Sequence, residues 1–553
     1  MQKQYLLSCF LLGFSSIVTA QRWDNYKPDN SKIKLTETNL PILYITTNNQ
    51  TIDRENRIEA DMVLIDNGLN QLNYSDTLQH PGQRFHYRGK IGLKYRGNSS
   101  FTMSDKKPYS IRPQNSAGKK QEVSLLGMGK DSDWALLAPF SDKSMIRDML
   151  SFSLAAPYFE YVPTGRYCEL ILDNTYYGVY ILSERVRKGK NRLNIPSPGD
   201  TGDALTGGYH LEVDRDDEAV YQSRHTPVNT KGNVLYGKKI SFQYKSPEYE
   251  DLTPTQLSFI HGRIDEFENA LASPNYTDPQ TGYRKYIDVT SFIDYMLSTE
   301  FCHNVDGYRL STNLYKYADS VDPRFKMSLW DLNLGFGNAD YANGWRTDTW
   351  AYEFNDVNPS DNQLVPFWWY RLLKDPVFME EVKTRWTHYR ETAYSDQNIA
   401  HTIDSLTNLL NVNGAQQRNF QAWPRWNRYV WPNKHIASSY GDELAYLKDW
   451  IEKRLVFMDN ALLLPKDPSA VSEGLESKLA VYPNPVTTRQ SLQIEGEGIA
   501  SVRMILPTGQ LMYQRNVMER GRITIPMHGL SAGVYLLMVE QEGKFSFNKV
   551  IVR

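Results

Sequence analysis

Two short stretches decide how this chain is interpreted. Residues 304–308 read Asn-Val-Asp-Gly-Tyr, and residues 330–337 read Trp-Asp-Leu-Asn-Leu-Gly-Phe-Gly. Between them, residues 313–318 and 325–330 have the composition of strands, and Asp322-Pro323 is a turn signal. We therefore predict a β-hairpin that follows the first stretch and leads into the second.

The hairpin is expected to gather oxygen ligands at one end. If Ala318 pairs with Phe325, Asn313 lies opposite Trp330, with paired Cβ atoms about 5 Å apart, and Asp331 follows directly. A carboxylate beside a carboxamide oxygen suits Mg²⁺, which keeps several waters and takes phosphate oxygens at its remaining positions.

Asp306 lies in the loop that feeds the first strand of the hairpin, and Gly335 and Gly337 after the second acid allow a close backbone approach. The order of loop Asp, Asn, hairpin and Asp-containing turn also occurs in protein kinases, where the first Asp accepts the hydroxyl proton and the other two residues hold metal. Plainer readings stay open: Asp306 before Gly307 could be a turn residue, and Asp331 could cap the next segment.

A cation for phosphate groups is expected upstream. Residues 105–112 have the pattern of a strand in which Lys107, Tyr109 and Ile111 share one face. Tyr109 and Ile111 have the character of core residues, so Lys107 is expected to point inward, where it needs an anionic partner such as a phosphate or a Glu. It could instead reach solvent from the strand end.

At these residues the chain resembles the CotH (spore coat protein H) kinase family, an atypical and secreted kinase-like family. The resemblance runs over residues 40–338. Its marks are Leu93-Lys94-Tyr95-Arg96-Gly97-Asn98-Ser99, Lys106-Lys107-Pro108-Tyr109, Ser144-Met145-Ile146-Arg147-Asp148, Tyr177-Gly178-Val179-Tyr180 with Ser183-Glu184, Gly207-Gly208-Tyr209, Asn304-Val305-Asp306 and Trp330-Asp331.

The resemblance implies a role for each matching residue. Lys107 looks like the lysine that binds the ATP phosphates, with Glu184 as its partner, although Glu184 could equally be a surface or ion-pair residue. Asp306 looks like the catalytic acid, and Asn313 and Asp331 look like the metal ligands. The implied cofactor is Mg²⁺ or Mn²⁺ with ATP.

One position departs from the family pattern. The family often has a second Asp two positions after the metal-binding Asp, and here that position is Asn333. A neutral amide in place of a charge is expected to weaken the affinity for a divalent cation.

The end of the chain resembles the type A sorting domain of the type IX secretion system of Bacteroidetes. The matching residues are Val481-Tyr482-Pro483-Asn484-Pro485, Pro507-Thr508-Gly509, Leu530-Ser531-Ala532-Gly533-Val534-Tyr535-Leu536 and Lys549-Val550-Ile551-Val552-Arg553. The resemblance implies export across the outer membrane by the type IX secretion machinery, to the cell surface or the medium. A β-sandwich module that binds another ligand is the alternative.

The two ends of the chain and its composition limit the remaining possibilities. Residues 1–20 have the pattern of a signal peptide, and no later stretch is long and apolar enough for a transmembrane helix. The 62 Lys and Arg nearly balance the 64 Asp and Glu, so no nucleic-acid partner is expected. Beyond the signal peptide only Cys168 and Cys302 could form a disulfide.

Hydrophobic patterning predicts an α+β fold with two lobes over residues 21–464, and the family resemblance implies that this domain is an atypical protein-kinase-like domain. Strands are expected in the first half, at 42–46, 91–96, 109–112, 167–172, 179–183 and 209–213, along with one helix at 143–154. Helices are expected in the second half, at 257–271, 289–301, 377–394 and 443–463. A linker at 465–478 leads to a C-terminal β-sandwich at 479–553, with strands at 492–494, 501–506, 523–525, 534–539 and 545–552.

The hypothesis that follows is a secreted, kinase-like protein that transfers the γ-phosphoryl group of ATP to a hydroxyl of an unknown protein acceptor. The alternative is a non-catalytic surface, adhesive or glycan-binding protein on the same scaffold, because ATP is scarce outside cells. Trp423, Trp426 and Trp431 could form a sugar platform, but an arginine-stacked core is favoured. The motifs of serine hydrolases and zinc proteases are lacking.

Overall fold

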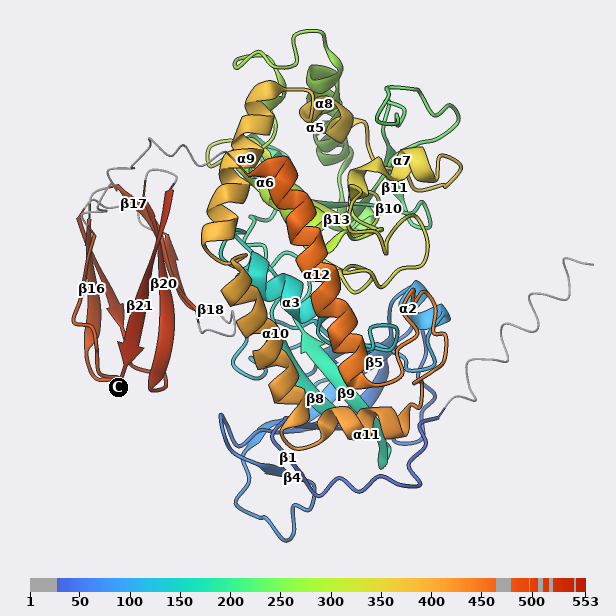
Figure 1. Cartoon of the computed structure of the whole chain (residues 1–553), viewed down its shortest axis with the longest axis vertical. Coiled ribbons are helices and arrows are strands. Elements are labelled where there is room, and N and C mark those ends of the chain that lie inside the picture. The colour runs from blue at the N-terminus through green and yellow to red at the C-terminus, as the bar shows by residue number, and fades with distance from the viewer. Residues whose placement is uncertain (1–26, 464–478, 497, 506–510, 517–520, 542–543) are drawn as a thin grey trace, which may run out of the picture. The chain divides into compact units, whose positions relative to one another are not determined.

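The computed structural model describes residues 27–463, 479–496, 498–505, 511–516, 521–541 and 544–553 (Figure 1). The expected signal peptide and the linker from residue 465 lie outside these residues. The chain folds into two compact units. The first comprises the chain up to Met145, with Gly165–Arg185 and Asn408–Glu443, and the second comprises Ile146–Thr164, Val186–Thr407 and the chain from Leu444.

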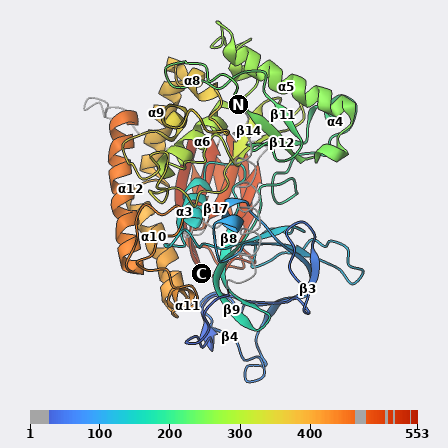
Figure 2. The same ribbon diagram turned by 90° about the vertical axis from the view of Figure 1, so that its right-hand side faces the viewer.

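A closed β-barrel forms the first unit, and Figure 2 shows its ring of strands. Neighbouring strands are antiparallel except for β2 and β8, whose parallel pairing closes the barrel. The strands, in order around the barrel, are β2 (Ile42–Thr46), β3 (Ile58–Ile65), β5 (Phe85–Tyr95), β6 (Tyr109–Pro113), β7 (Trp134–Leu137), β9 (Thr175–Ser183) and β8 (Gly165–Leu172). Short strands β1 (Glu37–Thr38) and β4 (Asn73–Tyr74) pair separately, and α2 (Ser99–Thr102) follows β5.

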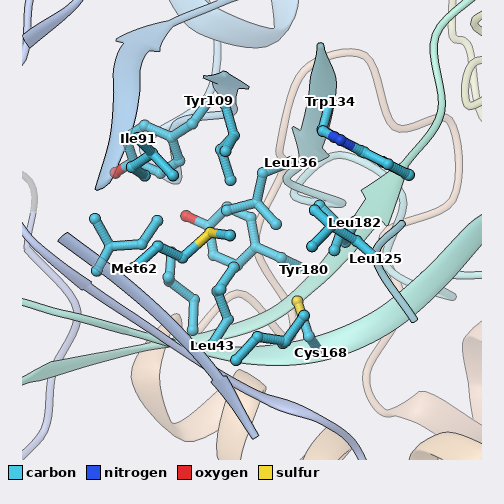
Figure 3. Packing of buried hydrophobic residues seen from close by; sticks show 14 of the residues in the cluster. Leu43, Met62, Ile91, Tyr109, Leu125, Trp134, Leu136, Cys168, Tyr180 and Leu182 are labelled. Atoms are coloured by element: carbon cyan, nitrogen blue, oxygen red, sulfur yellow. The ribbon is translucent and has the colours of Figure 1, made fainter. Parts of the chain in front are cut away.

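The inside of the barrel is filled by side chains. Alternate residues of a strand point to the same face, so each strand supplies apolar groups to the interior, among them Ile91, Tyr109, Leu136 and Tyr180 (Figure 3). Tyr109 and Ile111 are buried as the sequence pattern predicts. The barrel interior is therefore a packed apolar core.

Residues 408–443 complete the first unit through α11 (Ala415–Ala422). Asn419 on this helix accepts a hydrogen bond from the fully buried Lys106 at 2.9 Å. The Trp423 indole donates to the carbonyl of Tyr177 at 2.8 Å, and the buried Arg425 lies over the rings of Phe140 and Phe420. Trp423 and Arg425 thus belong to the core, as the favoured interpretation predicted, whereas Trp426 and Trp431 are half-buried and the rings under Arg425 are phenylalanines.

The second unit contains an antiparallel five-stranded sheet in the order β11, β12, β10, β13, β14. Its strands are β10 (Tyr209–Asp214), β11 (Val220–Gln222), β12 (Ser241–Ser246), β13 (Thr312–Lys316) and β14 (Phe325–Ser328). β13 and β14 form the expected hairpin, but Lys316, and not Ala318, pairs with Phe325. The carbonyl of Ala318 instead accepts the N–H groups of Val321 and Asp322, so Ala318 belongs to the turn.

Helices surround this sheet (Figure 1). α6 packs along β14 and contacts α3 and α9, while α5 contacts α8. The helices after residue 145, apart from α11, are α3 (Arg147–Ala155), α4 (Gly202–Thr206), α5 (Pro254–Ala272), α6 (Val289–Cys302), α7 (Phe354–Val357), α8 (Trp368–Leu372), α9 (Pro376–Glu391), α10 (Asp396–Asn411) and α12 (Tyr440–Leu462). The α+β class is confirmed, with strands concentrated early and helices late, although α3 begins later than expected because residues 143–146 are a buried turn.

The C-terminal strands form two antiparallel sheets, one with the order β15, β16, β19 and the other with the order β18, β17, β20, β21. Their bounds are β15 (Ala480–Tyr482), β16 (Ser491–Gly496), β17 (Ile499–Ile505), β18 (Leu511–Asn516), β19 (Gly521–Pro526), β20 (Gly533–Gln541) and β21 (Lys544–Val552). Buried side chains of both sheets, such as Ile494 and Val502, belong to one apolar cluster. β15 and β18 were not expected from the sequence pattern.

Two further expectations concern cysteines and membranes. Cys168 and Cys302 are both buried and carry free thiols, so they do not form the disulfide that the sequence allowed. Among the described residues, no helix combines the length and the apolar character that a bilayer span requires.

A buried ion pair joins α6 to α12. Glu300 and Arg454 are fully buried and lie 3.1 Å apart. The Glu300 carboxylate also accepts hydrogen bonds from the Tyr308 hydroxyl and from the N–H groups of Ala351 and Tyr352, at 2.8, 2.8 and 3.1 Å. Arg454 additionally donates to the carbonyl of Glu300 at 2.9 Å. Because burial removes both charges from water, the pair depends on this complete set of partners.

We predict that Arg454→Met lowers the free energy of unfolding by about 3 to 5 kcal/mol, because it leaves the Glu300 carboxylate buried without its cation. Unfolding in urea measures the loss. Lys453→Met, at the neighbouring exposed position, is the control and should change stability by less than about 0.5 kcal/mol. In the double variant Glu300→Gln with Arg454→Met, part of the stability should return. Equal losses for Arg454→Met and Lys453→Met would contradict the role of the pair.

Glu268 on α5 is a second fully buried acid. It accepts hydrogen bonds from the Ser223 hydroxyl at 2.6 Å and from the Trp368 indole at 2.9 Å. Burial raises the pKa of Glu268 to about 7, although both hydrogen bonds oppose the shift. Because the folded protein binds this proton more tightly than the unfolded chain, stability falls as the pH rises from 4.5, the ordinary pKa of a glutamate, through about 7.

Glu268→Gln should remove this pH dependence, because the amide imitates the protonated acid. The stability of the wild type relative to Glu268→Gln should decrease by about 3 kcal/mol between pH 4.5 and pH 8. Thermal or urea unfolding at a series of pH values measures the difference. Glu266→Gln, at an exposed position of the same helix, is the control. A wild type and a Glu268→Gln variant with parallel pH profiles would contradict the assignment.

Candidate functional site

Asp306 lies in the segment that connects α6 to β13. Its carboxylate is one fifth exposed and accepts a hydrogen bond from Arg309 at 2.7 Å and one from the Tyr341 hydroxyl at 3.3 Å. Arg309 is itself buried, with its guanidinium over the Phe354 ring at 3.9 Å and its Nε donating to the Val305 carbonyl. Burial and the Asp306 charge together raise the pKa of Tyr341. Asp306 is thus an oriented carboxylate with access to solvent.

Asp331 follows β14 and is exposed. Its backbone has φ of 61°, the left-handed region that non-glycine residues rarely adopt. The Asn333 amide donates to one carboxylate oxygen at 3.0 Å, and the preceding Trp330 stacks on Phe152 of α3. Asp331 is therefore held in a strained conformation, which is often a feature of functional sites.

The side chain of Asn304 joins the two segments that carry these acids. Its Oδ1 accepts the N–H of Asp306 at 3.3 Å, and its Nδ2 donates to the carbonyl of Asp331 at 3.1 Å. Asn304 is buried and follows His303, which ends α6 in the left-handed conformation with φ of 49°. The sequence marked Asn304 as part of a motif but gave it no role. An Asn side chain often hydrogen bonds to the backbone two residues later, in an Asx-turn. The spacing of Asn304 and Asp306 could therefore have identified this contact from the sequence.

Asn313 lies on β13 opposite Ser328 of β14, so the expected pairing with Trp330 is wrong. The cause is the earlier end of the strand at Lys316. The Asn313 side chain is buried; its Oδ1 lies 2.8 Å from His210 Nε2, and its Nδ2 donates to the Ser311 carbonyl. Asn313 therefore presents an oxygen that His210 fixes in place.

The donor chemistry at these positions fits a hard divalent cation. Asp331 offers a carboxylate and Asn313 an amide oxygen, and Mg²⁺ in nucleotide sites commonly takes few protein ligands beside water and phosphate. Among the described residues, no group of three or more His, Cys, Asp and Glu gathers that would hold a metal by itself. A metal here would thus depend on the oxygen atoms of a bound phosphate.

The loop after Asp331 is fixed by α3, α6 and α12. The Asp148 carboxylate accepts the N–H of Leu332 at 2.9 Å, and Arg147 donates to the carbonyl of Gly335 at 3.2 Å. A Cβ at Gly335 would lie 2.8 Å from the Cys302 carbonyl oxygen. Gly337, with φ of 72°, leaves no room beside Trp450. The expected close backbone approach at both glycines is confirmed, and helices provide the neighbouring groups.

The expected phosphate-binding lysine lies in the first unit. Lys107 lies two residues before β6 and is buried, as predicted. Its ammonium donates to the Phe101 carbonyl at 2.7 Å and to that of Ser104. Glu184 follows β9 and is also buried; it attracts Arg166, whose pKa burial lowers to about 10. A pairing of Lys107 with Glu184 stays a prediction.

Comparison with protein families identifies both parts of the chain. The family model described as CotH kinase protein matches residues 93–458, which is more than half of the chain. The model described as secretion system C-terminal sorting domain matches residues 480–553. The second match shows that the protein is exported through type IX secretion, to the cell surface or the medium. Comparison with curated proteins gave no significant match.

The conformation of Asp331 gives a prediction that is independent of activity. Asp331→Gly should be more stable than Asp331→Ala by about 1 kcal/mol, because glycine adopts a positive φ without steric cost while alanine does not. Urea unfolding measures the difference. The same two substitutions at the exposed Asp348 are the control, and there alanine should be at least as stable as glycine. Equal stability of the two Asp331 variants would show that this backbone is not strained.

Proposed function

The chain belongs to the CotH kinase protein family, and from this premise we propose that it transfers the γ-phosphoryl group of ATP to a hydroxyl of a protein acceptor. The two family matches support the general description of a secreted, kinase-like protein. The observation that carries the proposal further is the Asn304 side chain, which hydrogen bonds to the backbone of both Asp306 and Asp331.

Asp306 is the proposed catalytic residue. Its carboxylate would accept the proton of the acceptor hydroxyl while that oxygen attacks the γ-phosphorus, and the bond from phosphorus to the bridging oxygen of ADP breaks. Arg309 supports this role because its 2.7 Å hydrogen bond fixes the orientation of the carboxylate. Partial exposure of Asp306 leaves room for the acceptor.

Asp331 and Asn313 are the proposed ligands of Mg²⁺ or Mn²⁺. When bound, such an ion neutralises charge on the phosphate oxygens. His210 supports the assignment of Asn313 because its ring nitrogen holds the Asn313 oxygen in a fixed position. Asn333 supplies an N–H donor where a second carboxylate would add charge, so we expect weak metal affinity in the absence of nucleotide.

Lys107 and Glu184 are the proposed nucleotide-binding residues of the barrel unit. The Lys107 ammonium, held by carbonyl oxygens of the 101–104 turn, would bind phosphate oxygens, and Glu184 would orient it. We propose accordingly that the two units correspond to the two lobes of a kinase-like domain over residues 21–464. The linker would span 465–478, and the C-terminal sheets would form a sorting β-sandwich at 479–553.

A second candidate is a non-catalytic surface protein on the same scaffold. The hydrogen bond from Asn333 to Asp331 favours it, because it occupies one of the carboxylate oxygens that a metal would use. A glycan-binding role has less support, since Trp423 and Arg425 are buried in the core.

Incubation of the purified protein with radiolabelled ATP and Mg²⁺, alone and with an extract of surface proteins, tests the proposal. We expect label on the protein itself or on an acceptor, and a loss of roughly 100-fold or more in Asp306→Asn and Asp331→Ala. Lys107→Ala should mainly raise the KM for ATP. Asp348→Ala, an exposed acid of the same unit, is the control and should retain transfer. ATP binding without any transfer by the wild type would favour the non-catalytic scaffold.

A further inference from the structure

The second unit contains a polar cavity that none of the proposed catalytic steps uses. Its volume is about 330 Å³, at the lower end of the range for ligand sites. The walls come from the end of β10, from β11 and β12, and from four connecting segments of the same unit. The charged residues that line it are Asp214, Asp216, Lys238, Lys239 and Arg309.

Two residues that line the cavity also contact residues 303–311, the segment that carries Asp306. Arg309, which lines the cavity, forms the 2.7 Å ion pair with Asp306. Asp214, the last residue of β10, accepts the N–H of Ser311 at 2.9 Å. Ser311 lies two residues before Asn313. A molecule bound in the cavity would therefore lie one side chain away from the carboxylate that is proposed to receive the acceptor proton.

Within the part of the chain that the structure describes, neither of the two ammonium groups in the cavity forms an ion pair with a carboxylate, although Glu268 attracts Lys239 at longer range. Lys238 donates to the Ser360 carbonyl at 2.7 Å and to the Asn362 amide oxygen at 3.2 Å. Lys239 makes one long contact, at 3.5 Å, to the carbonyl of Ser223. Neutral oxygens stabilise an ammonium less than a carboxylate does, so both lysines remain available to an anionic group.

The other charges do not cancel this excess. Arg309 is already bound to Asp306 and lies 3.7 Å from Asp361. The Asp214 carboxylate is engaged by Arg215 and Ser311. Asp216 is exposed and is the one acid of the lining left to oppose the two lysines. The lining therefore carries a small excess of positive charge, which favours an anionic group.

The rim of the cavity is suited to a polypeptide. The side chain of Tyr236, next in sequence to the lining residue Gly237, is 87% exposed, and Val234 is 40% exposed. Their segment is fixed by the bridge between Val228 and Val234 and by the N–H of Thr230, which donates to Asp356 at 3.0 Å. An exposed aromatic on a fixed segment can bind apolar parts of a chain at low entropic cost.

We propose that this cavity binds an acidic side chain of the acceptor polypeptide through Lys238 and Lys239, and so brings a neighbouring hydroxyl to Asp306. The inference deepens the proposed function and rests on it for the transfer step. The acceptor class that it names is a protein with Asp or Glu close to the phosphorylated Ser or Thr. Attraction by two lysines that face the solvent is expected to weaken as salt screens it.

Binding of fluorescent peptides to the full chain, without ATP, tests the site separately from catalysis. Two peptides of equal length carry one Ser flanked either by Glu or by Lys. We expect the Glu peptide to bind about tenfold more tightly at low salt, and the double variant Lys238→Ala with Lys239→Ala to lose this preference. Lys231→Ala, at an exposed position of the same segment outside the cavity, is the control and should leave the preference unchanged. Equal binding of the two peptides would overturn the proposal.

Further measurements distinguish failure of the peptide site from failure of the proposed catalytic function. The Asp331→Ala variant should still prefer the Glu peptide, because Asp331 does not line the cavity. A wild type that prefers the Glu peptide but transfers no phosphoryl group would count against the proposed function alone. In an active protein, the double alanine variant should raise the KM for the Glu peptide by about tenfold with little change in kcat, and Lys238→Glu with Lys239→Glu should reverse the preference. Displacement of the peptide by millimolar inorganic phosphate would identify a phosphate site and overturn the acidic-peptide assignment.

Discussion

The buried pair of Glu300 and Arg454 is the constraint on which the rest of the second unit depends. Placing two charges where water cannot reach is costly unless their hydrogen-bonding capacity is filled, and here Tyr308, Ala351 and Tyr352 bind the carboxylate together with Arg454. Burial lowers the pKa of Arg454 to about 10, so the guanidinium remains charged at neutral pH. The pair thereby fixes the end of α6 against α12 and, through Tyr308, holds the segment that carries Asp306.

The positions of the two acids follow from that attachment. α6 ends at His303 in a left-handed conformation, and this turn directs Asn304 between the two loops. One amide then sets the backbone of both Asp306 and Asp331, while α3 holds the following loop through Asp148. A kinase-like site needs positioning and charge complementarity more than covalent chemistry. In this protein, hydrogen bonds to the backbone of the two loops, from Asn304 and from side chains of α3, hold both acids in place.

The sequence predicted local features well and the contacts between distant segments poorly. Period-two and period-3.6 patterns identified the strand at Ile42–Thr46 and the helix at Val289–Cys302, because each depends on neighbouring residues. The hairpin register was wrong because the carbonyl of Ala318 is used in the turn. The closure of the barrel by parallel pairing of β2 with β8, and the partners of Arg454, join residues far apart in the sequence, and no local pattern encodes them. The inward direction of Lys107 followed from alternation, but its carbonyl partners did not.

Export places additional demands on this fold, and burial meets one of them. A protein that passes through an oxidising compartment with two thiols risks mispairing or oxidation, because the thiolate is the reactive form. Burial raises the pKa values of Cys168 and Cys302 to about 12, so almost no thiolate exists at neutral pH. Cys302 also ends the helix that leads to Asn304, and its carbonyl accepts the N–H of Phe336. Its inertness therefore protects the same helix end that sets Asp306 and Asp331, and the site can persist outside the cell without a disulfide to stabilise it.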